Sequence, residues 1–78
     1  MIVKVRLFAS FREIAKNDYI ELELNEHSTY NDLVNKISEK LNVNKMEVKL
    51  LSGDEQVKLD ANIDIYKKII AFPPVAGG

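Results

Sequence analysis

The chain has 78 residues, 46% of them hydrophobic and 29% charged, with 11 basic and 12 acidic side chains. This length allows one domain, and the composition is that of a folded protein rather than a disordered one. The net charge of −1 argues against a dedicated nucleic-acid-binding protein. The absence of cysteine excludes a disulfide-stapled secreted miniprotein, a thiol nucleophile and a cysteine-based zinc site.

The N-terminal segment lacks the continuous apolar stretch of a signal peptide. No stretch approaches the roughly 20 apolar residues that a membrane-spanning helix needs. We therefore expect a cytoplasmic protein with neither a membrane nor a nucleic acid as its partner.

The first 15 residues predict a strand followed by a short helix. Residues 2–8 alternate apolar with charged side chains, as in a half-buried strand, and the expected inward set is Val3, Val5 and Leu7. Ser10 and Glu13 match the Ser-x-x-Glu capping box, which makes Ser10 the expected N-cap. The apolar side of this helix, one or two turns long, would comprise Phe11, Ile14 and Ala15.

A second strand is predicted over residues 19–25, after the turn-forming pair Asn17-Asp18. Its inward side chains are expected to be Ile20, Leu22 and Leu24. Because only a short connection separates it from the first strand, the two should form an antiparallel pair.

The one long helix is predicted to begin after Thr29 as its N-cap and to stop at Asn42 in a left-handed conformation. Asp32 lies favourably in the first turn. The helix carries an apolar stripe of Leu33, Val34, Ile37 and Leu41.

Three strands are predicted in the second half of the chain. Residues 46–51 and 56–59 alternate and flank the hairpin loop Ser52-Gly53-Asp54-Glu55. Residues 67–72 form the most continuously apolar run, typical of a central strand, and Pro73 must end it because proline lacks the N–H of the ladder. The order of elements predicts an α+β domain in which a mixed sheet of four to five strands packs on one main helix.

Motifs of catalysis are missing from the sequence. It contains no Gly-rich phosphate loop, no His-Glu-x-x-His and no Gly-x-Ser-x-Gly. The single histidine, His27, falls in a predicted loop, and Asp54, Glu55, Asp60 and Asp64 are explained by turns and solubility. Taken alone, the chain is a weak enzyme candidate and is expected to bind no metal or cofactor.

The last eight residues, AFPPVAGG, form an unusual end to a small domain. Two prolines favour an extended, stiff arm after the last strand. The three residues from Ala76 on have almost no side chain and reach roughly 10 Å when extended. Such an arm fits a channel too narrow for a Cβ atom and presents a carboxylate at its far end. We therefore divide the chain into a domain over 1–72 and a flexible Gly-Gly tail over 73–78.

A terminal carboxylate becomes an acyl donor when a partner adenylates it with ATP. A sulfur nucleophile then converts it into a thiocarboxylate, or a lysine amine takes the acyl group and forms an isopeptide bond. The competing interpretation is a frayed terminus whose glycines have no role.

The blocks VRLFASFREI (5–14) and AFPPVAGG (71–78) resemble the sulfur-carrier subunit of molybdopterin synthase, the MoaD family, within the ubiquitin-like β-grasp proteins. The resemblance spans the whole chain. One segment departs from the family pattern: where the family usually has an Asp-Gly-Asp-like turn before the last strand, this chain has Tyr66-Lys67-Lys68.

The resemblance implies that an E1-like enzyme, using ATP and a sulfur donor, adenylates and thiocarboxylates Gly78. The tail then enters the large synthase subunit, in an expected heterotetramer whose catalytic residues lie on that subunit, and donates sulfur to cyclic pyranopterin monophosphate. Gly77 would give steric clearance. The partner-binding residues would be Phe72, Pro73, Pro74, Val75, Ala76, Phe8 and Arg12. Plain core packing is an equal alternative for Phe8, and a helix-capping pair with Glu13 is the alternative for Arg12.

Two other functions share the same activation chemistry. The chain would be a ubiquitin-like modifier if Gly78 were joined to lysines of target proteins, or a carrier for tRNA thiolation if the thiocarboxylate served that pathway. We favour the molybdopterin carrier, then the modifier.

Overall fold

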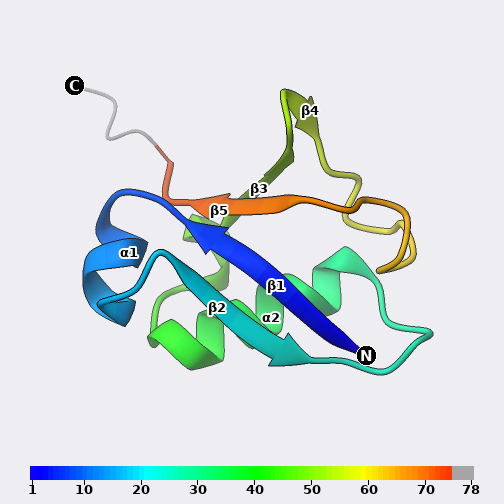
Figure 1. Ribbon diagram of the computed structural model, residues 1–78, viewed down its shortest axis with the longest axis horizontal. Coiled ribbons are helices and arrows are strands. Elements are labelled where there is room, and N and C mark those ends of the chain that lie inside the picture. The colour runs from blue at the N-terminus through cyan, green and yellow to red at the C-terminus, as the bar shows by residue number, and fades with distance from the viewer. Residues whose placement is uncertain (75–78) are drawn as a thin grey trace.

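The computed structural model describes residues 1–74 of the chain (Figure 1). Five strands, two α-helices and one 3-10 turn follow one another in this part. In chain order they are β1 (Ile2–Leu7), α1 (Ser10–Ala15), β2 (Tyr19–Glu23), α2 (Tyr30–Leu41), η1 (Lys45–Glu47), β3 (Lys49–Ser52), β4 (Glu55–Gln56) and β5 (Ile69–Phe72).

The five strands form one mixed sheet in the order β2-β1-β5-β3-β4. β1 pairs antiparallel with β2, as predicted, whereas β1 and β5 are parallel, with Leu7 opposite Ala71. β5 also pairs antiparallel with β3. The predicted central position of the last strand is therefore confirmed, and so is its end at Phe72.

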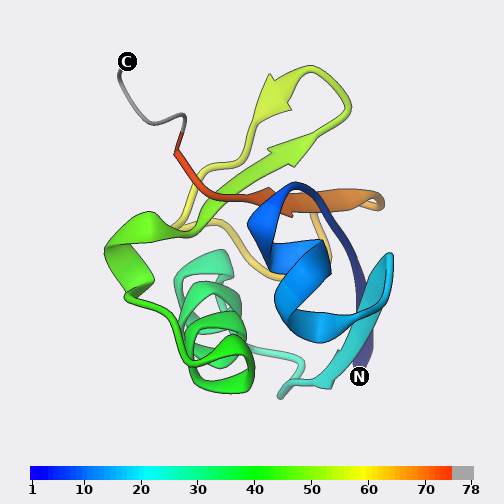
Figure 2. The same ribbon diagram turned by 90° about the vertical axis from the view of Figure 1, so that its left-hand side faces the viewer.

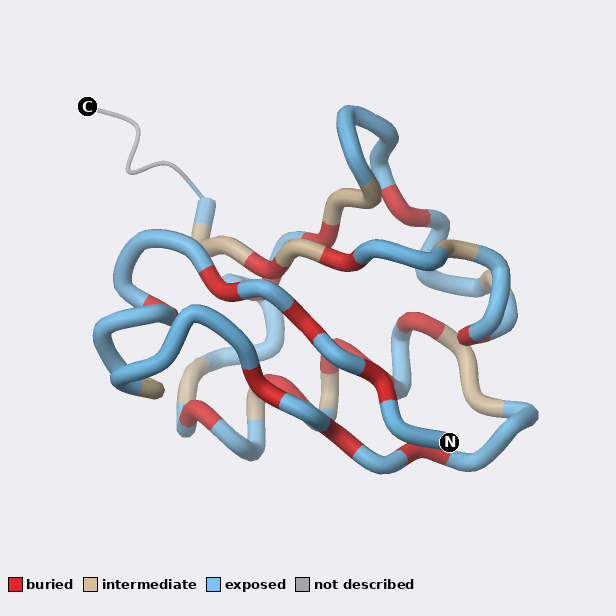
Figure 3. The backbone as a smooth tube through the Cα atoms, in the orientation of Figure 1, coloured by how far each residue is buried: buried red, intermediate tan, exposed pale blue. Residues whose placement is uncertain are grey.

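The hydrophobic core lies between one face of the sheet and α2 (Figure 2). Burial alternates along β1 and β2 in Figure 3, so the predicted inward side chains of both strands are confirmed. The largest fully buried side chains are Tyr30, Phe11, Leu7, Leu33, Ile37 and Val5. Within residues 1–74 no helix covers the opposite face of the sheet, and the alternating side chains of β1 and β2 on that face are exposed.

Both predicted ends of the long helix are confirmed. The Thr29 side chain accepts a hydrogen bond from the Asp32 N–H at 3.4 Å, and the Asp32 carboxylate accepts one from the Thr29 N–H at 2.9 Å. These reciprocal bonds satisfy backbone donors that the first helical turn leaves free. At the other end Asn42 is left-handed, with φ 56° and ψ 47°, and the predicted apolar stripe of α2 is buried.

The predicted cap of the short helix is wrong. Ser10 is the first helical residue of α1, Ala9 holds the N-cap position with φ 55°, and no side chain caps this end. Phe11 is buried, but Ile14 is 48% exposed. The capping-box pattern fails because the end of β1 and the burial of Phe11 set where this six-residue helix begins.

The second half of the chain also corrects two strand boundaries. The Asn44 side chain accepts a hydrogen bond from the Met46 N–H at 2.8 Å, so residues 45–47 form η1, and β3 begins at Lys49 rather than at Met46. β4 has only two residues, although Val57 after it is buried and still bonds to the Leu50 carbonyl at 3.4 Å. The hairpin turn itself is confirmed, with Gly53 at φ 64°.

A buried tyrosine organises the irregular segment between β4 and β5. The Tyr30 hydroxyl donates to the Ile63 carbonyl at 2.7 Å and accepts from the Tyr66 N–H at 2.8 Å. The rings of Tyr30 and Tyr66 meet edge to face with their centroids 5.2 Å apart. One hydroxyl on α2 thus fixes the loop that precedes the central strand.

Tyr30→Phe is expected to lower the free energy of unfolding by about 1–3 kcal/mol, because the substitution leaves the Ile63 carbonyl and the Tyr66 N–H without this partner. Urea denaturation followed by circular dichroism measures the change. Tyr19→Phe is the matched control, since Tyr19 is 40% exposed and its hydroxyl has no hydrogen bond within residues 1–74. Equal losses in both variants would contradict a role for the Tyr30 hydroxyl.

The same variant has a predicted pH signature. Burial raises the pKa of Tyr30 above its ordinary value of 10.0, because the phenolate is poorly hydrated there. Above about pH 10 the unfolded chain releases this proton before the folded one, so the free energy of unfolding falls as pH rises. The difference in unfolding free energy between the wild type and Tyr30→Phe should therefore shrink at alkaline pH.

Candidate functional site

The candidate site lies where the chain leaves the sheet at the end of β5. The Phe8 N–H donates to the Ala71 carbonyl at 3.1 Å, which ties the end of β1 to the end of β5. Ala71 is buried, Phe72 and Pro73 are half-buried, and Pro74 is exposed. The chain therefore leaves the sheet next to the buried Ala71, at a point beside α1 (Figure 1).

Phe8 stands exposed next to this exit. Its side chain is 41% accessible, and the Arg6 guanidinium lies over its ring at 5.1 Å from the centroid. Core packing is therefore the wrong interpretation of Phe8. An exposed aromatic beside the half-buried Phe72 offers apolar contact area to a partner, although its docking role stays a prediction.

Arg12 is exposed on α1 and turns toward the α1–β2 connection. Its guanidinium lies 3.9 Å from the Asp18 carboxylate, and the two side chains are 60% and 65% accessible. The alternative of a capping pair with Glu13 is wrong, since the ion pair is with Asp18. Exposed pairs of this kind contribute about 0–1 kcal/mol, so stability does not require Arg12. Its predicted contact with a partner remains a prediction.

The outer face of the sheet contains residues that sequence reasoning left out of the site. Lys4 and Arg6 project from β1, and the Lys4 ammonium lies 4.4 Å from the centroid of the Tyr19 ring on β2. Arg6 is 6.0 Å from the same ring and is also near Phe8. The alternation of β1 indicated that these cations face outward, but not which residues of other strands they would meet.

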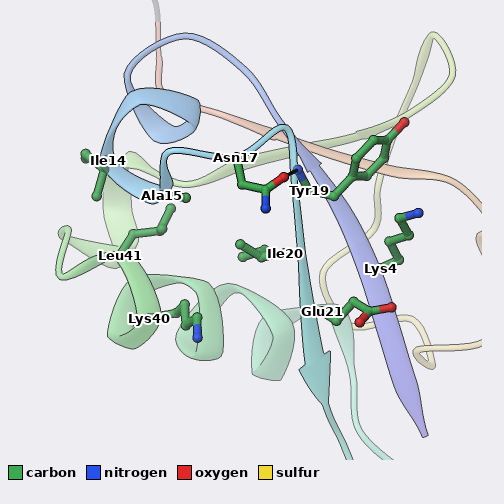
Figure 4. A pocket seen from close by; sticks show the side chains of 9 residues that line it. All are labelled: Lys4, Ile14, Ala15, Asn17, Tyr19, Ile20, Glu21, Lys40 and Leu41. Atoms are coloured by element: carbon green, nitrogen blue, oxygen red, sulfur yellow. Dashed lines mark hydrogen bonds between the residues drawn. The ribbon is translucent and has the colours of Figure 1, made fainter.

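A surface hollow beside α1 is lined by none of the predicted site residues (Figure 4). It has a volume of about 690 Å³ and opens between α1, the outer strand β2 and the end of α2. Ile14, Ala15, Ile20 and Leu41 supply its apolar wall, and the polar side chains around it include no serine or histidine. The Asn17 side chain accepts a hydrogen bond from the Tyr19 N–H there, which explains Asn17 as a turn residue.

The remaining polar candidates are dispersed over the surface. His27 is exposed in the loop before α2, where its backbone N–H donates a hydrogen bond to the Asn25 side chain at 2.9 Å. Within residues 1–74 no three histidine or carboxylate side chains gather in a way that could hold a metal ion. No helix in this range is long and apolar enough to cross a membrane.

The rest of the predicted tail falls outside the described residues. These positions are Val75, Ala76, Gly77 and Gly78. The predicted role of Gly78 as the site of sulfur loading, and the predicted roles of the three residues before it, therefore stay predictions. What the structure places is the base of the tail, Phe72 to Pro74.

Comparisons with known proteins identify the architecture. No protein-family model and no curated protein matches the sequence. Among solved structures, SAMP1 from Haloferax volcanii superposes with a TM-score of 0.74 over 100% of both chains, at 19% identity. The HVO 2177 protein of Haloferax volcanii has a TM-score of 0.74 at 23% identity, over 100% of this chain and 87% of that one.

A third neighbour is described as the molybdopterin converting factor, subunit 1, from Pyrococcus furiosus. It has a TM-score of 0.73 at 27% identity, and the match covers 96% of this chain and 99% of that one. The mixed five-stranded sheet on one main helix is common to these small proteins. The chain therefore has the ubiquitin-like β-grasp fold of SAMP1 and of the molybdopterin converting factor subunit.

Proposed function

We propose that this protein is a sulfur carrier for molybdopterin biosynthesis and that its reactive group is the carboxyl of Gly78. The observation that carries the proposal is the base of the tail. The central strand β5 ends at Phe72 and is followed by Pro73 and Pro74, and the N–H of the exposed Phe8 bonds to the Ala71 carbonyl at this end. The likeness to a molybdopterin converting factor subunit from Pyrococcus furiosus supports the same function.

The proposed chemistry has two steps and belongs to an E1-like partner. The Gly78 carboxylate attacks the α-phosphorus of ATP, pyrophosphate leaves, and an acyl adenylate forms. Hydrosulfide released by a sulfur donor then attacks the acyl carbon and displaces AMP, and loss of its proton leaves a thiocarboxylate at Gly78. ATP and the sulfur donor are used by the activating enzyme, and this chain binds neither on its own.

The proposed acceptor step takes place on a second partner. The loaded tail enters the large subunit of molybdopterin synthase, in a heterotetramer, and donates its sulfur to cyclic pyranopterin monophosphate. The side chains that catalyse this transfer belong to the large subunit, so the carrier is not itself an enzyme. The fold that this chain has in common with small carrier and modifier proteins supports the assignment of catalysis to the partner. A cytoplasmic location stays a prediction.

Intact-mass spectrometry tests the carrier function directly. Protein produced together with its E1-like enzyme and a sulfur source should gain the mass of one sulfur-for-oxygen exchange, and fragmentation should place it at Gly78. Protein produced without that enzyme is the control. An unchanged mass, with the enzyme shown to be active on ATP, would argue against the carrier function.

The second candidate is a protein modifier, and the likeness to SAMP1, the small archaeal modifier protein 1, favours it. In this function a lysine amine of a target attacks the acyl adenylate and AMP leaves. Trypsin cuts after Lys68, so modified lysines should carry the remnant IIAFPPVAGG. A proteome from active cells that lacks this branched remnant would remove the modifier.

A further inference from the structure

Four cations from distant parts of the sequence meet in one pocket on the outer face of the sheet. Lys4 and Arg6 come from β1, and Lys67 and Lys68 come from the segment just before β5. The pocket has a volume of about 350 Å³, Tyr19, Ile69 and Ile70 supply its apolar part, and Gly53 is the remaining lining residue. We call the set Lys4, Arg6, Lys67, Lys68, Tyr19 and Ile70 the cationic pocket.

The cationic pocket concentrates positive charge on a chain whose net charge is −1. No carboxylate lines it. Within residues 1–74 the single ion pair joins Arg12 to Asp18, so none of the four pocket cations has an acidic partner within 4.0 Å there. Like charges that line one pocket repel one another unless another group neutralises them, and such a concentration of one sign attracts an opposite charge.

Aromatic rings hold two of these cations in place. The Lys4 ammonium lies over Tyr19 at 4.4 Å, and the Arg6 guanidinium lies over Phe8 at 5.1 Å. Cations positioned in this way lose less side-chain freedom when they bind, which favours a specific partner over diffuse attraction. Phe8 also connects the pocket to the exit of the tail, because its N–H bonds to Ala71.

The mixed character of the pocket indicates the class of its occupant. A nucleic acid requires an extended basic surface on a basic domain, whereas this chain is slightly acidic and its excess cations are local. A half-apolar concave surface with cations on its rim instead matches a protein segment in which carboxylates flank an apolar side chain.

We propose that the cationic pocket docks an acidic segment of the E1-like enzyme that adenylates Gly78, with Asp or Glu side chains against Lys4, Arg6, Lys67 and Lys68 and one apolar side chain against Tyr19 and Ile70. The proposal rests on the proposed function for the identity of the partner. It is supported by continuity, because the paired strands β1 and β5 contribute residues to the pocket and β5 also leads into the base of the tail.

The test reverses the charge of the segment before β5. In the variant Lys67→Glu/Lys68→Glu, the Kd of the complex with the E1-like enzyme and the KM for the carrier in adenylation are each expected to rise about tenfold or more. kcat at saturating carrier should stay the same, because neither substituted residue belongs to the tail. The dependence of Kd on salt should also weaken, since fewer charges are paired across the interface.

The matched control is Lys36→Glu/Lys40→Glu on α2, which changes the net charge by the same amount on exposed positions outside the pocket. It should change Kd and KM by less than about twofold, since distant exposed charges are screened. Thermal melting must show that both variants remain folded. Equal effects of the two double variants, or an unchanged Kd in the pocket variant, would overturn the proposal.

The readouts separate this proposal from the carrier function. If the enzyme charges wild-type and pocket variant with the same KM, the pocket proposal fails and the carrier function stands. If the enzyme binds wild-type tightly and the pocket variant weakly but never modifies Gly78, the docking proposal stands and the carrier function fails. Two other results would overturn the proposal of an acidic protein partner. One is binding of single-stranded RNA that only the pocket variant loses, and the other is a dimer, seen by sedimentation, that only this variant loses.

Discussion

Deletion of Gly77 and Gly78 is expected to reduce sulfur loading to background while leaving the domain as stable as the intact chain. The loading step needs a carboxyl at the end of an arm without side chains, and the deletion ends the chain at Ala76 instead. Within residues 1–74 the last buried core residue is Ala71, five positions before that new end, so the deletion keeps every core residue of this part. Intact mass measures loading, and thermal melting measures stability.

The substitution Gly77→Val sharpens this test because it keeps the length of the tail. A branched side chain next to the reacting carbonyl should block loading by the E1-like enzyme. Gly77 is six positions beyond Ala71, the last core residue within residues 1–74, and substitutions away from the core usually change stability by about ±0.5 kcal/mol, so melting should hardly change. Unimpaired loading of Gly77→Val would show that the enzyme does not require a narrow tail.

The control for both tail variants is Asn42→Ala, which should behave in the opposite way. Asn42 is left-handed at the end of α2, and alanine is disfavoured there by roughly 1–2 kcal/mol per residue. This variant should therefore melt earlier and yet load sulfur normally at a temperature where it is folded. Parallel loss of stability and loading in the tail variants would mean that the tail has a structural role.

Phe11→Ala is expected to cost about 3–5 kcal/mol of unfolding free energy, as other large core truncations do. Phe11 is 1% exposed and is the one buried side chain of α1. At roughly 0.05–0.15 kcal/mol per residue, a small domain has a total stability of the same order. A large fraction of the variant should therefore be unfolded at 37 °C, as urea denaturation and near-ultraviolet circular dichroism can measure.

Ile14→Ala on the same helix is the matched control. Ile14 is 48% exposed, so its truncation should change the unfolding free energy by about 0.5 kcal/mol or less. Equal costs for Phe11 and Ile14 would mean that α1 packs with the face predicted from sequence periodicity. A large cost at Phe11 alone would support the packing in the structure, in which this helix is anchored by one side chain next to Phe8.

The candidate site was only partly accessible to sequence reasoning. The block around Phe8 and the run Phe72-Pro73-Pro74 could be identified from the resemblance to sulfur carriers, and the prolines alone predicted where the last strand ends. The direct hydrogen bond between the Phe8 N–H and the Ala71 carbonyl could not, because it joins residues 63 positions apart. The choice between core packing and exposure for Phe8 likewise required the packed structure.

Features that depend on residues close together in the chain could be predicted from the sequence. Alternation specified the buried side chains of β1 and β2, the reciprocal bonds of Thr29 and Asp32 set the start of α2, and a left-handed Asn42 ended it. These are local effects, because the periods of strands and helices and the caps of helices involve residues within a few positions of one another.

Features that depend on contacts between residues far apart in the chain could be seen only in the tertiary structure. Ser10 matched a capping box, yet packing of Phe11 made it the first helical residue instead. The Tyr30 hydroxyl accepts a hydrogen bond from the Tyr66 N–H in a distant loop. The parallel pairing of β1 with β5 brings Lys67 and Lys68 into the same pocket as Lys4 and Arg6. The physical reason is that closing such long loops is favourable only when the whole core forms, so no local pattern encodes these contacts.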